Sequence, residues 1–99
     1  MGATCGICAN DVTALAALKF LRGRQVRTPG DISVMGFDNA PVVALENRLT
    51  TFDFNAMGFI RAMLSFVLRP PKPRGAYRHK TIEIKGIVLE RDTTGRARP

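Results

Sequence analysis

Residues that build catalytic and metal-binding sites are scarce in this sequence. Its 99 residues include two cysteines, one histidine and no tryptophan. The histidine, His79, lies between two basic residues and has no partnered serine or cysteine motif, so a nucleophilic triad finds no support. The glycines Gly36 and Gly58 stand alone, so no glycine-rich phosphate loop is present. We therefore expect a protein that is not an enzyme and that has no cofactor and no metal.

The two cysteines, Cys5 and Cys8, form a single CxxC motif. Such a motif can be a redox pair or half of a metal site, but no second CxxC is present. If the segment is a strand, positions that differ by three point to opposite faces of the sheet. The two side chains could then neither share a metal ion nor easily form a disulfide. We interpret them as two buried thiols.

Long apolar runs are also missing. The longest mostly apolar stretch, residues 56–68, is interrupted by Arg61 and is too short to span a bilayer. The N-terminus has no basic region followed by an apolar core, so no secretory signal is visible. We expect a cytoplasmic protein that does not associate with a membrane.

Acidic residues are few, with eight against 15 basic ones, and the formal net charge is +7. A basic surface often binds nucleic acid or another polyanion. Here the basic residues are spread along the chain, and no aromatic residues are interleaved with them as in a base-stacking surface. We interpret most of them as solvated, and a basic stand-alone nucleic-acid-binding protein remains as an alternative.

Two apolar segments end in polar side chains. Residues 32–37 read as a buried strand that is followed by Asp38, and residues 3–9 read as a strand that is followed by Asn10. The carboxyl ends of consecutive parallel strands lie on one rim of a sheet, where ligands of open α/β folds bind. The same two side chains could merely cap the helices that follow them, and the pattern alone does not decide between these interpretations.

Local signals place the other elements. An Ala- and Leu-rich helix follows the first strand and Gly23 is its expected left-handed stop; Asn39 is expected to cap a short helix with Pro41 in its first turn. Asn55 is expected to cap a helix over 56–68, whose wide apolar arc predicts burial on much of its surface. The remaining expectations are an extended stretch at 49–54, an exposed proline-rich connector at 69–75, a last strand within 78–90 that breaks at Gly86, and a frayed tail from 91.

These elements make an α/β set that is too thin to cover both faces of a parallel sheet, so we expect part of a larger domain. Several segments carry a further signal: Cys8-Ala9-Asn10-Asp11, then residues 29–39, then Leu49-Thr50-Thr51, then residues 87–95. In this order and spacing they resemble the effector-binding core of the lactose-repressor/purine-repressor family of bacterial transcription regulators. The resemblance covers nearly the whole chain.

The resemblance implies a fragment of a periplasmic-binding-protein-like (type I) fold, a three-layer domain with a parallel sheet. In that fold two α/β subdomains enclose an effector. It implies these parts: residues 3–48 in the C-terminal subdomain, 49–69 as crossover and helix, 70–76 as linker, 77–92 as final strand and 93–99 as tail. The DNA-binding domain of the family is absent from this sequence.

The resemblance also implies residue roles. Asn10 and Asp38 would contact the effector, and Phe52 and Asp53, after the crossover, are weaker candidates for the same site. Val12, Leu15 and Leu45 would lie at the dimer interface, although their pattern alone would place them in a core. Asn39 stands where a second acid is common in the family.

The leading hypothesis is the effector-binding and dimerisation portion of a transcription regulator that responds to a small molecule, such as a sugar or a nucleobase compound. The regulator would be a homodimer that binds operator DNA through a domain missing from this chain. Part of a periplasmic-type solute-binding protein is a further alternative.

Overall fold

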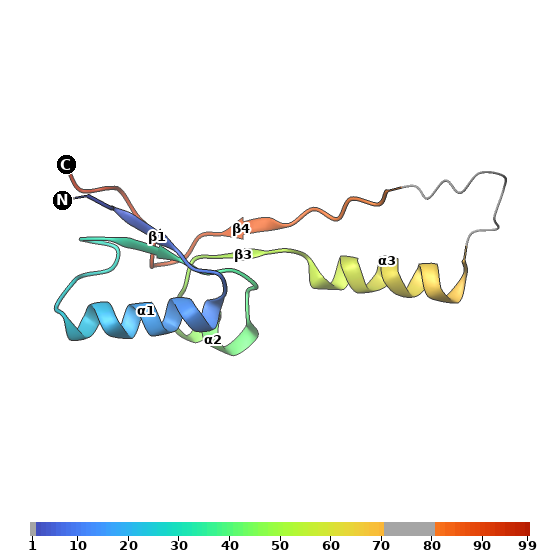
Figure 1. Ribbon diagram of the computed structural model, residues 1–99, viewed down its shortest axis with the longest axis horizontal. Coiled ribbons are helices and arrows are strands. Elements are labelled where there is room, and N and C mark those ends of the chain that lie inside the picture. Colours follow the sequence, from blue (N-terminus) through green and yellow to red (C-terminus); the bar gives the residue numbers. More distant parts are fainter. Residues whose placement is uncertain (1, 71–80) are drawn as a thin grey trace. The chain divides into compact units, whose positions relative to one another are not determined.

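The computed structural model describes residues 2–70 and 81–99 (Figure 1). The elements are β1 (Cys5–Ile7), α1 (Asp11–Gly23), β2 (Ser33–Met35), α2 (Pro41–Glu46), β3 (Thr51–Asp53), α3 (Ala56–Leu68) and β4 (Ile87–Leu89). The chain divides into two compact units: residues up to Asp53 together with Ile87–Pro99 form the first, and Phe54–Gly86 form the second. Each unit is described by itself.

The strands of the first unit form two pairs that are joined edge to edge. β1 pairs with β2 in parallel, and β3 pairs with β4 in antiparallel orientation. A parallel bridge between Met35 and Thr50 links the pairs, and the Gly36 N–H extends it by donating to the Thr50 carbonyl at 2.9 Å. β1, β2 and β3 therefore run in the same direction, and their carboxyl ends lie on one edge, named here the carboxyl edge.

Both helices of this unit lie on one side of the strands (Figure 1). Their small residues Ala14 and Ala44 are fully buried and meet Val34 and Leu49 in the core. Because no other helix belongs to the described part of this unit, the opposite side has no helical cover, and Ile7 on β1 is 76% exposed. The expectation of an α/β set too thin for a doubly covered sheet agrees with this arrangement.

The helix ends differ from two expectations. Gly23 is the last residue of α1 and not its left-handed stop; Gln25, at φ 60°, is the left-handed residue, because the chain turns only after the backbone N–H of Arg24 has bonded back to the helix. Asn39 does not cap α2. Ala40 occupies the cap position without a side-chain bond, and Pro41 starts the helix as expected.

The C-terminal segment is ordered where a frayed tail was expected. Thr93 is buried, and its Oγ1 donates to the Val34 carbonyl at 2.7 Å. Gly95 exchanges hydrogen bonds with Ser33, since its N–H donates to Ser33 Oγ at 3.1 Å. The expected last strand is confirmed only at Ile87–Leu89; residues 77–80 lie outside the described ones.

The second unit contains α3, which begins as predicted. Asn55, at φ 61°, caps it by accepting the Gly58 N–H at 3.0 Å. The predicted burial is wrong: α3 has no buried residue, because in the described part of this unit only residues 81–86 lie against one of its sides. Most of the proline-rich connector and His79 lie outside the described residues.

Two other expectations concern exposure. Cys5 is exposed and Cys8 half-buried, so the interpretation as two buried thiols is wrong for Cys5, which lies on the sparsely covered strand β1. Both are free cysteines. Among the described residues, no helix combines the length and the apolar character that crossing a lipid bilayer requires.

Candidate functional site

Backbone hydrogen bonds bring the ends of β1, β2 and β3 together at the carboxyl edge. The Asp11 N–H donates to the Phe37 carbonyl at 3.0 Å, which joins the residues after β1 to those after β2. The Asp38 N–H donates to the Phe52 carbonyl at 2.9 Å, which joins the latter to β3. Four residues predicted for ligand binding therefore lie along this edge: Asn10, Asp38, Phe52 and Asp53.

Asn10 is the N-cap of α1. Its backbone is extended, and its side-chain Oδ1 accepts the Thr13 N–H at 2.8 Å. The capping alternative is therefore observed. The cap uses the carbonyl oxygen of the side chain, and the amide nitrogen of the same group is not part of it. A ligand contact through that nitrogen stays a prediction.

Asp38 is exposed and has a backbone conformation that few non-glycine residues adopt. Its φ is 117°, and Asn39 follows at φ 54°. Such conformations persist where the surroundings impose them, and they cluster at functional sites. Here the next two N–H groups are held as well: that of Asn39 by Thr51 Oγ1 at 3.2 Å, and that of Ala40 by Asp11 Oδ2 at 2.6 Å. Residues 37–40, named here the strand-end loop, are thus fixed by β3 and by the start of α1.

Two aromatic rings stack at the same edge. The ring centroids of Phe37 and Phe52 are 5.2 Å apart, with an interplanar angle of 21°. Phe37 is 37% exposed, so part of this pair faces solvent. An apolar surface beside a carboxylate and an amide is the usual composition of a small-molecule site.

Asn39 and Arg91 form a polar cluster with Asp53 that no sequence pattern predicts. Asn39 Nδ2 donates to Asp53 Oδ2 at 3.1 Å, and Arg91 Nη2 donates to Asn39 Oδ1 at 3.0 Å. Arg91 Nη1 also donates to the Leu49 carbonyl at 2.9 Å. Asp53 therefore lies at the carboxyl edge with one carboxylate oxygen engaged by Asn39, and its contact with a ligand stays a prediction. No local pattern marks Arg91, because its partners are distant in sequence.

Asp11 is the second residue that was missed. Its carboxylate is 1% exposed and accepts hydrogen bonds from the Thr51 hydroxyl and the Ala40 N–H, both at 2.6 Å. Gly36 packs directly against it: a Cβ at Gly36 would lie 2.2 Å from Asp11 Oδ1. The acid after Asn10 thus connects α1 to β3 and to the strand-end loop.

The residues predicted for dimerisation are mostly exposed. Val12 and Leu45 each expose 66% of their surface, and Leu15 is half-buried. The alternative that all three belong to a core is therefore wrong for Val12 and Leu45. Their role at a dimer interface stays a prediction.

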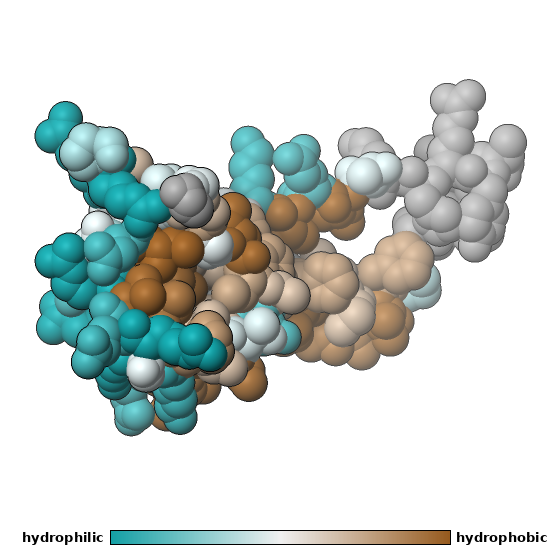
Figure 2. Space-filling model, turned by 60° about the vertical axis from the view of Figure 1, so that its left-hand side comes forward, coloured by the Kyte–Doolittle hydropathy of each residue, from teal (hydrophilic) through white to brown (hydrophobic). Residues whose placement is uncertain are grey.

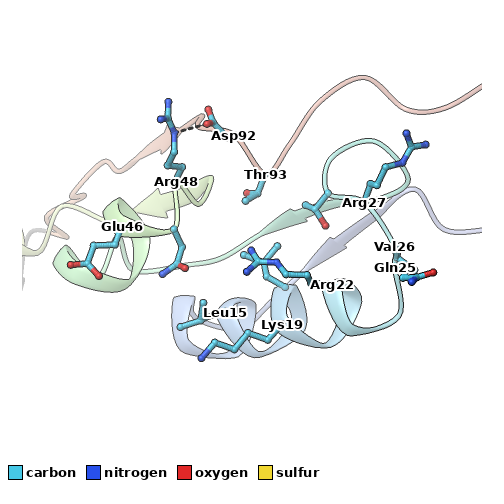
Figure 3. Close-up of a pocket in the computed structure, with 13 residues that line it drawn as sticks. Leu15, Lys19, Arg22, Gln25, Val26, Arg27, Glu46, Arg48, Asp92 and Thr93 are labelled. Carbon is cyan, nitrogen blue, oxygen red and sulfur yellow. Dashed lines mark ion pairs between the residues drawn. The ribbon is translucent and has the colours of Figure 1, made fainter.

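A groove of about 660 Å³ lies away from the carboxyl edge, lined by α1, the end of α2 and Thr93 (Figure 3). Two of the cations that line it do not converge: Figure 3 shows Arg27 and Arg48 pointing away from each other. Each of the two is paired, Arg48 with Asp92 and Arg27 with Asp31, and the hydrogen bonds of Arg27 lower the pKa of the Asp31 carboxyl to about 2. Of the predicted site residues only Leu15 lines this groove.

Among the described residues, no group of three or more His, Cys, Asp or Glu side chains could hold a metal ion. The polar groups at the carboxyl edge are hydrogen-bond donors and acceptors without a paired nucleophile and base. What they can do chemically is orient a small polar molecule.

Residues 3–94 match the family described as periplasmic binding protein-like domain, and the chain belongs to it. The predicted fold class is thereby confirmed. The chain is 34% identical over 79 residues to the HTH-type transcriptional regulator MalR of Streptomyces coelicolor, an alignment that covers 75% of this chain and 23% of that protein. It is 33% identical over 72 residues to the HTH-type transcriptional regulator DegA of Bacillus subtilis, covering 73% of this chain and 17% of that protein.

Solved structures agree with these relatives. A LacI-type transcription regulator from Bifidobacterium animalis subsp. lactis is 28% identical, with a TM-score of 0.75, over 94% of this chain and 33% of that one. A LacI-family transcriptional regulatory protein from Corynebacterium glutamicum is 30% identical, with a TM-score of 0.68, over 92% of this chain and 35% of that one. The relatives are transcription regulators and not enzymes, and this chain spans about a quarter of the length of the first curated relatives, 23% of each.

Proposed function

We propose that this chain is the effector-binding and dimerisation portion of a bacterial DNA-binding transcription regulator that responds to a small molecule such as a sugar. One observation supports it most: the exposed carboxylate of Asp38, the amide of Asn10 and the stacked Phe37–Phe52 pair lie on one carboxyl edge. Ligands of α/β folds with parallel strands bind outside this edge.

The chemistry of the edge fits a polyhydroxylated or nucleobase-like ligand. A carboxylate accepts hydrogen bonds from hydroxyl or amino groups, and an amide nitrogen donates one in return. The face of an aromatic ring packs on the apolar face of a sugar or on a base. In this proposal residues 3–48 form one wall of the effector cleft, and residues absent from the chain form the other wall and bind operator DNA. The regulator would be a cytoplasmic homodimer.

With one wall only, the isolated chain should bind effectors weakly, with dissociation constants on the order of millimolar or higher. The test is a titration of the isotope-labelled chain with glucose, sucrose and maltose, followed by amide chemical shifts in NMR. We expect shifts confined to residues 10–11, 37–39 and 52–53. Asp38→Asn should abolish them, whereas the control Asp31→Asn, at a half-buried acid away from this edge, should not.

Two outcomes would contradict the proposal. Tight sugar binding in calorimetry would show that the chain alone forms a complete binding site. Chemical-shift changes confined to the groove beside α1 would show that the ligand does not bind at the carboxyl edge. A set of nucleobases and nucleosides extends the same titration to the second ligand class.

A second candidate function rests on the net charge of +7. A stand-alone nucleic-acid-binding protein would retard duplex DNA at low salt, and its affinity would fall steeply as salt is raised. The absence of any retardation at low salt would remove this candidate.

A further inference from the structure

The chain passes between the two units at two places. Both places lie at the same end of the β3–β4 pair. The first unit ends at Asp53 and resumes at Ile87. These two residues are direct partners in the antiparallel register. Whatever fixes the ends of β3 and β4 therefore fixes where both connecting segments leave the first unit.

The side chain of Asn39 reaches this pair from the strand-end loop. Its Nδ2 donates to Asp53 Oδ2 at 3.1 Å, at the last residue before one connection. Its Oδ1 accepts from Arg91 Nη2 at 3.0 Å, and Arg91 lies just beyond β4. The donor of this amide is thus used at the end of β3 and its acceptor in the segment that follows β4, and all three residues are half-buried.

Arg91 and the strand-end loop are each held by further hydrogen bonds. Arg91 is held by its backbone N–H, which donates to Thr50 Oγ1 at 2.9 Å, and by its Nη1, which donates to the Leu49 carbonyl. The strand-end loop is held by three consecutive N–H groups, those of residues 38–40. The amide of Asn39 is therefore a defined contact between two rigid segments and not a mobile surface group.

We propose that Asn39 is a positioning residue that couples the strand-end loop to the ends of β3 and β4. This inference rests on the proposed function in one respect: the loop it couples also carries Asp38, the residue proposed to contact the effector. A ligand that moves Asp38 moves Asn39, and with it Asp53 and Arg91. Ligand binding at the edge is thereby communicated to Asp53, the last residue before one connection between the units, and to the segment that follows β4.

The side-chain chemistry of the coupling allows a specific test in the 99-residue chain without any ligand. Asn39→Asp keeps a residue that tolerates a positive φ but replaces the donor by a second carboxylate oxygen facing Asp53. We expect hydrogen exchange of the β3 and β4 amides to become at least about tenfold faster, the factor given by loss of a hydrogen bond to a charged group. Exchange in the β1–β2 pair should be unchanged.

The decisive variant exchanges the two partners. Asn39→Asp combined with Asp53→Asn places the donor on β3 and leaves an acceptor for Arg91 on the loop. We expect this double variant to restore slow exchange in β3 and β4. Asn47→Asp is the matched control, since the amide of Asn47 bonds only within α2, to the Val43 carbonyl.

A structural role alone would give a different result. Uniformly faster exchange over β1 to β4 in Asn39→Asp, unchanged exchange everywhere, or failure of the double variant to restore slow exchange would each overturn the inference. If Asn39→Asp does not fold, Asn39→Gly removes the amide while relieving the positive φ, and the same selective acceleration is expected. Because this test adds no ligand, its result does not depend on the outcome of the sugar titration.

Discussion

The two units of this chain differ in what they bury. In the first unit, buried polar side chains such as Asp11, Thr51 and Thr93 outnumber a small core of four apolar ones. In the second unit the helix α3 is strongly apolar yet has no buried residue, with Phe59, Leu64 and others largely exposed. The face drawn in Figure 2 shows this apolar surface in brown.

The comparison shows what each unit depends on. Within the described residues, every buried side-chain nitrogen or oxygen has a hydrogen-bond partner. The partners in the first unit join segments far apart in sequence, so its shape is specified by its own chain. A helix with a wide exposed apolar arc instead gains little stability from packing within its own unit. Exposed apolar surfaces of this kind mark interaction sites. Four predictions test this contrast, from the largest expected effect to the smallest.

Gly36→Ala should destabilise the first unit most. The added Cβ would lie 2.2 Å from Asp11 Oδ1 and 3.2 Å from the Asp11 backbone, so the buried acid must move. We expect a loss of about 3 kcal/mol in the free energy of unfolding, measured by urea titration with circular dichroism. Gly6→Ala is the control, because no atom lies within 4 Å of its added Cβ. Equal effects of the two variants would show that the packing around Asp11 is loose.

Asp11→Asn should cost about 1–3 kcal/mol in the same measurement. Both carboxylate oxygens accept a hydrogen bond, whereas the amide that replaces them offers one acceptor and turns a donor toward another donor. Asp92→Asn is the control, an exposed partner of Arg48 whose loss should cost less than about 1 kcal/mol. A stability of Asp11→Asn equal to that of the unchanged chain would mean that the buried polar contacts do not specify the first unit.

Replacing exposed apolar residues of α3 should act on association rather than on folding. We expect the chain to self-associate, and Phe59→Gln with Phe66→Gln to weaken this in sedimentation velocity while changing the stability of the first unit by less than about 0.5 kcal/mol. Arg61→Gln on the same helix is the control. A monodisperse monomer before substitution would contradict the prediction. Association lost instead with Val12→Gln and Leu45→Gln would place it on the first unit.

The smallest effect concerns the ion pair of Arg27 and Asp31. Hydrogen bonds from the Arg27 side chain and backbone lower the pKa of Asp31 from its ordinary value of 3.8 to about 2. A lowered pKa stabilises the folded state above pH 3.8, and this contribution is lost as the pH falls through about 2. An NMR titration of the Asp31 carboxyl should show the low midpoint, and Arg27→Gln should return it toward the ordinary value. A midpoint near 3.8 in the unchanged chain would mean that the pair is not formed.

Helix starts that are set by neighbouring residues could be predicted from the sequence. The cap of α3 by Asn55 and the start of α2 at Pro41 follow from local hydrogen bonding and from the fixed φ of proline. The site was predictable only in part. Asn10 and Asp38 could be placed on the carboxyl edge because polar residues that follow neighbouring parallel strands share one edge of the sheet. Arg91 could not be predicted, because its contacts join residues that are distant in the sequence. Asn39 lies 52 positions before it and Leu49 lies 42 positions before it.

By itself, the sequence determined the order of helices and strands, the parallel direction of β1 and β2, and the edge on which the candidate site lies. These follow from periodicity, caps and turns, which act within a few residues. Only the tertiary structure decided that Asp11 is buried, that α3 is not, that the segment from Thr93 to Gly95 is ordered, and that Asn39 joins the strand-end loop to β3 and Arg91. Burial and hydrogen bonding between distant segments depend on what the folded chain places beside each group, and no local pattern contains that information.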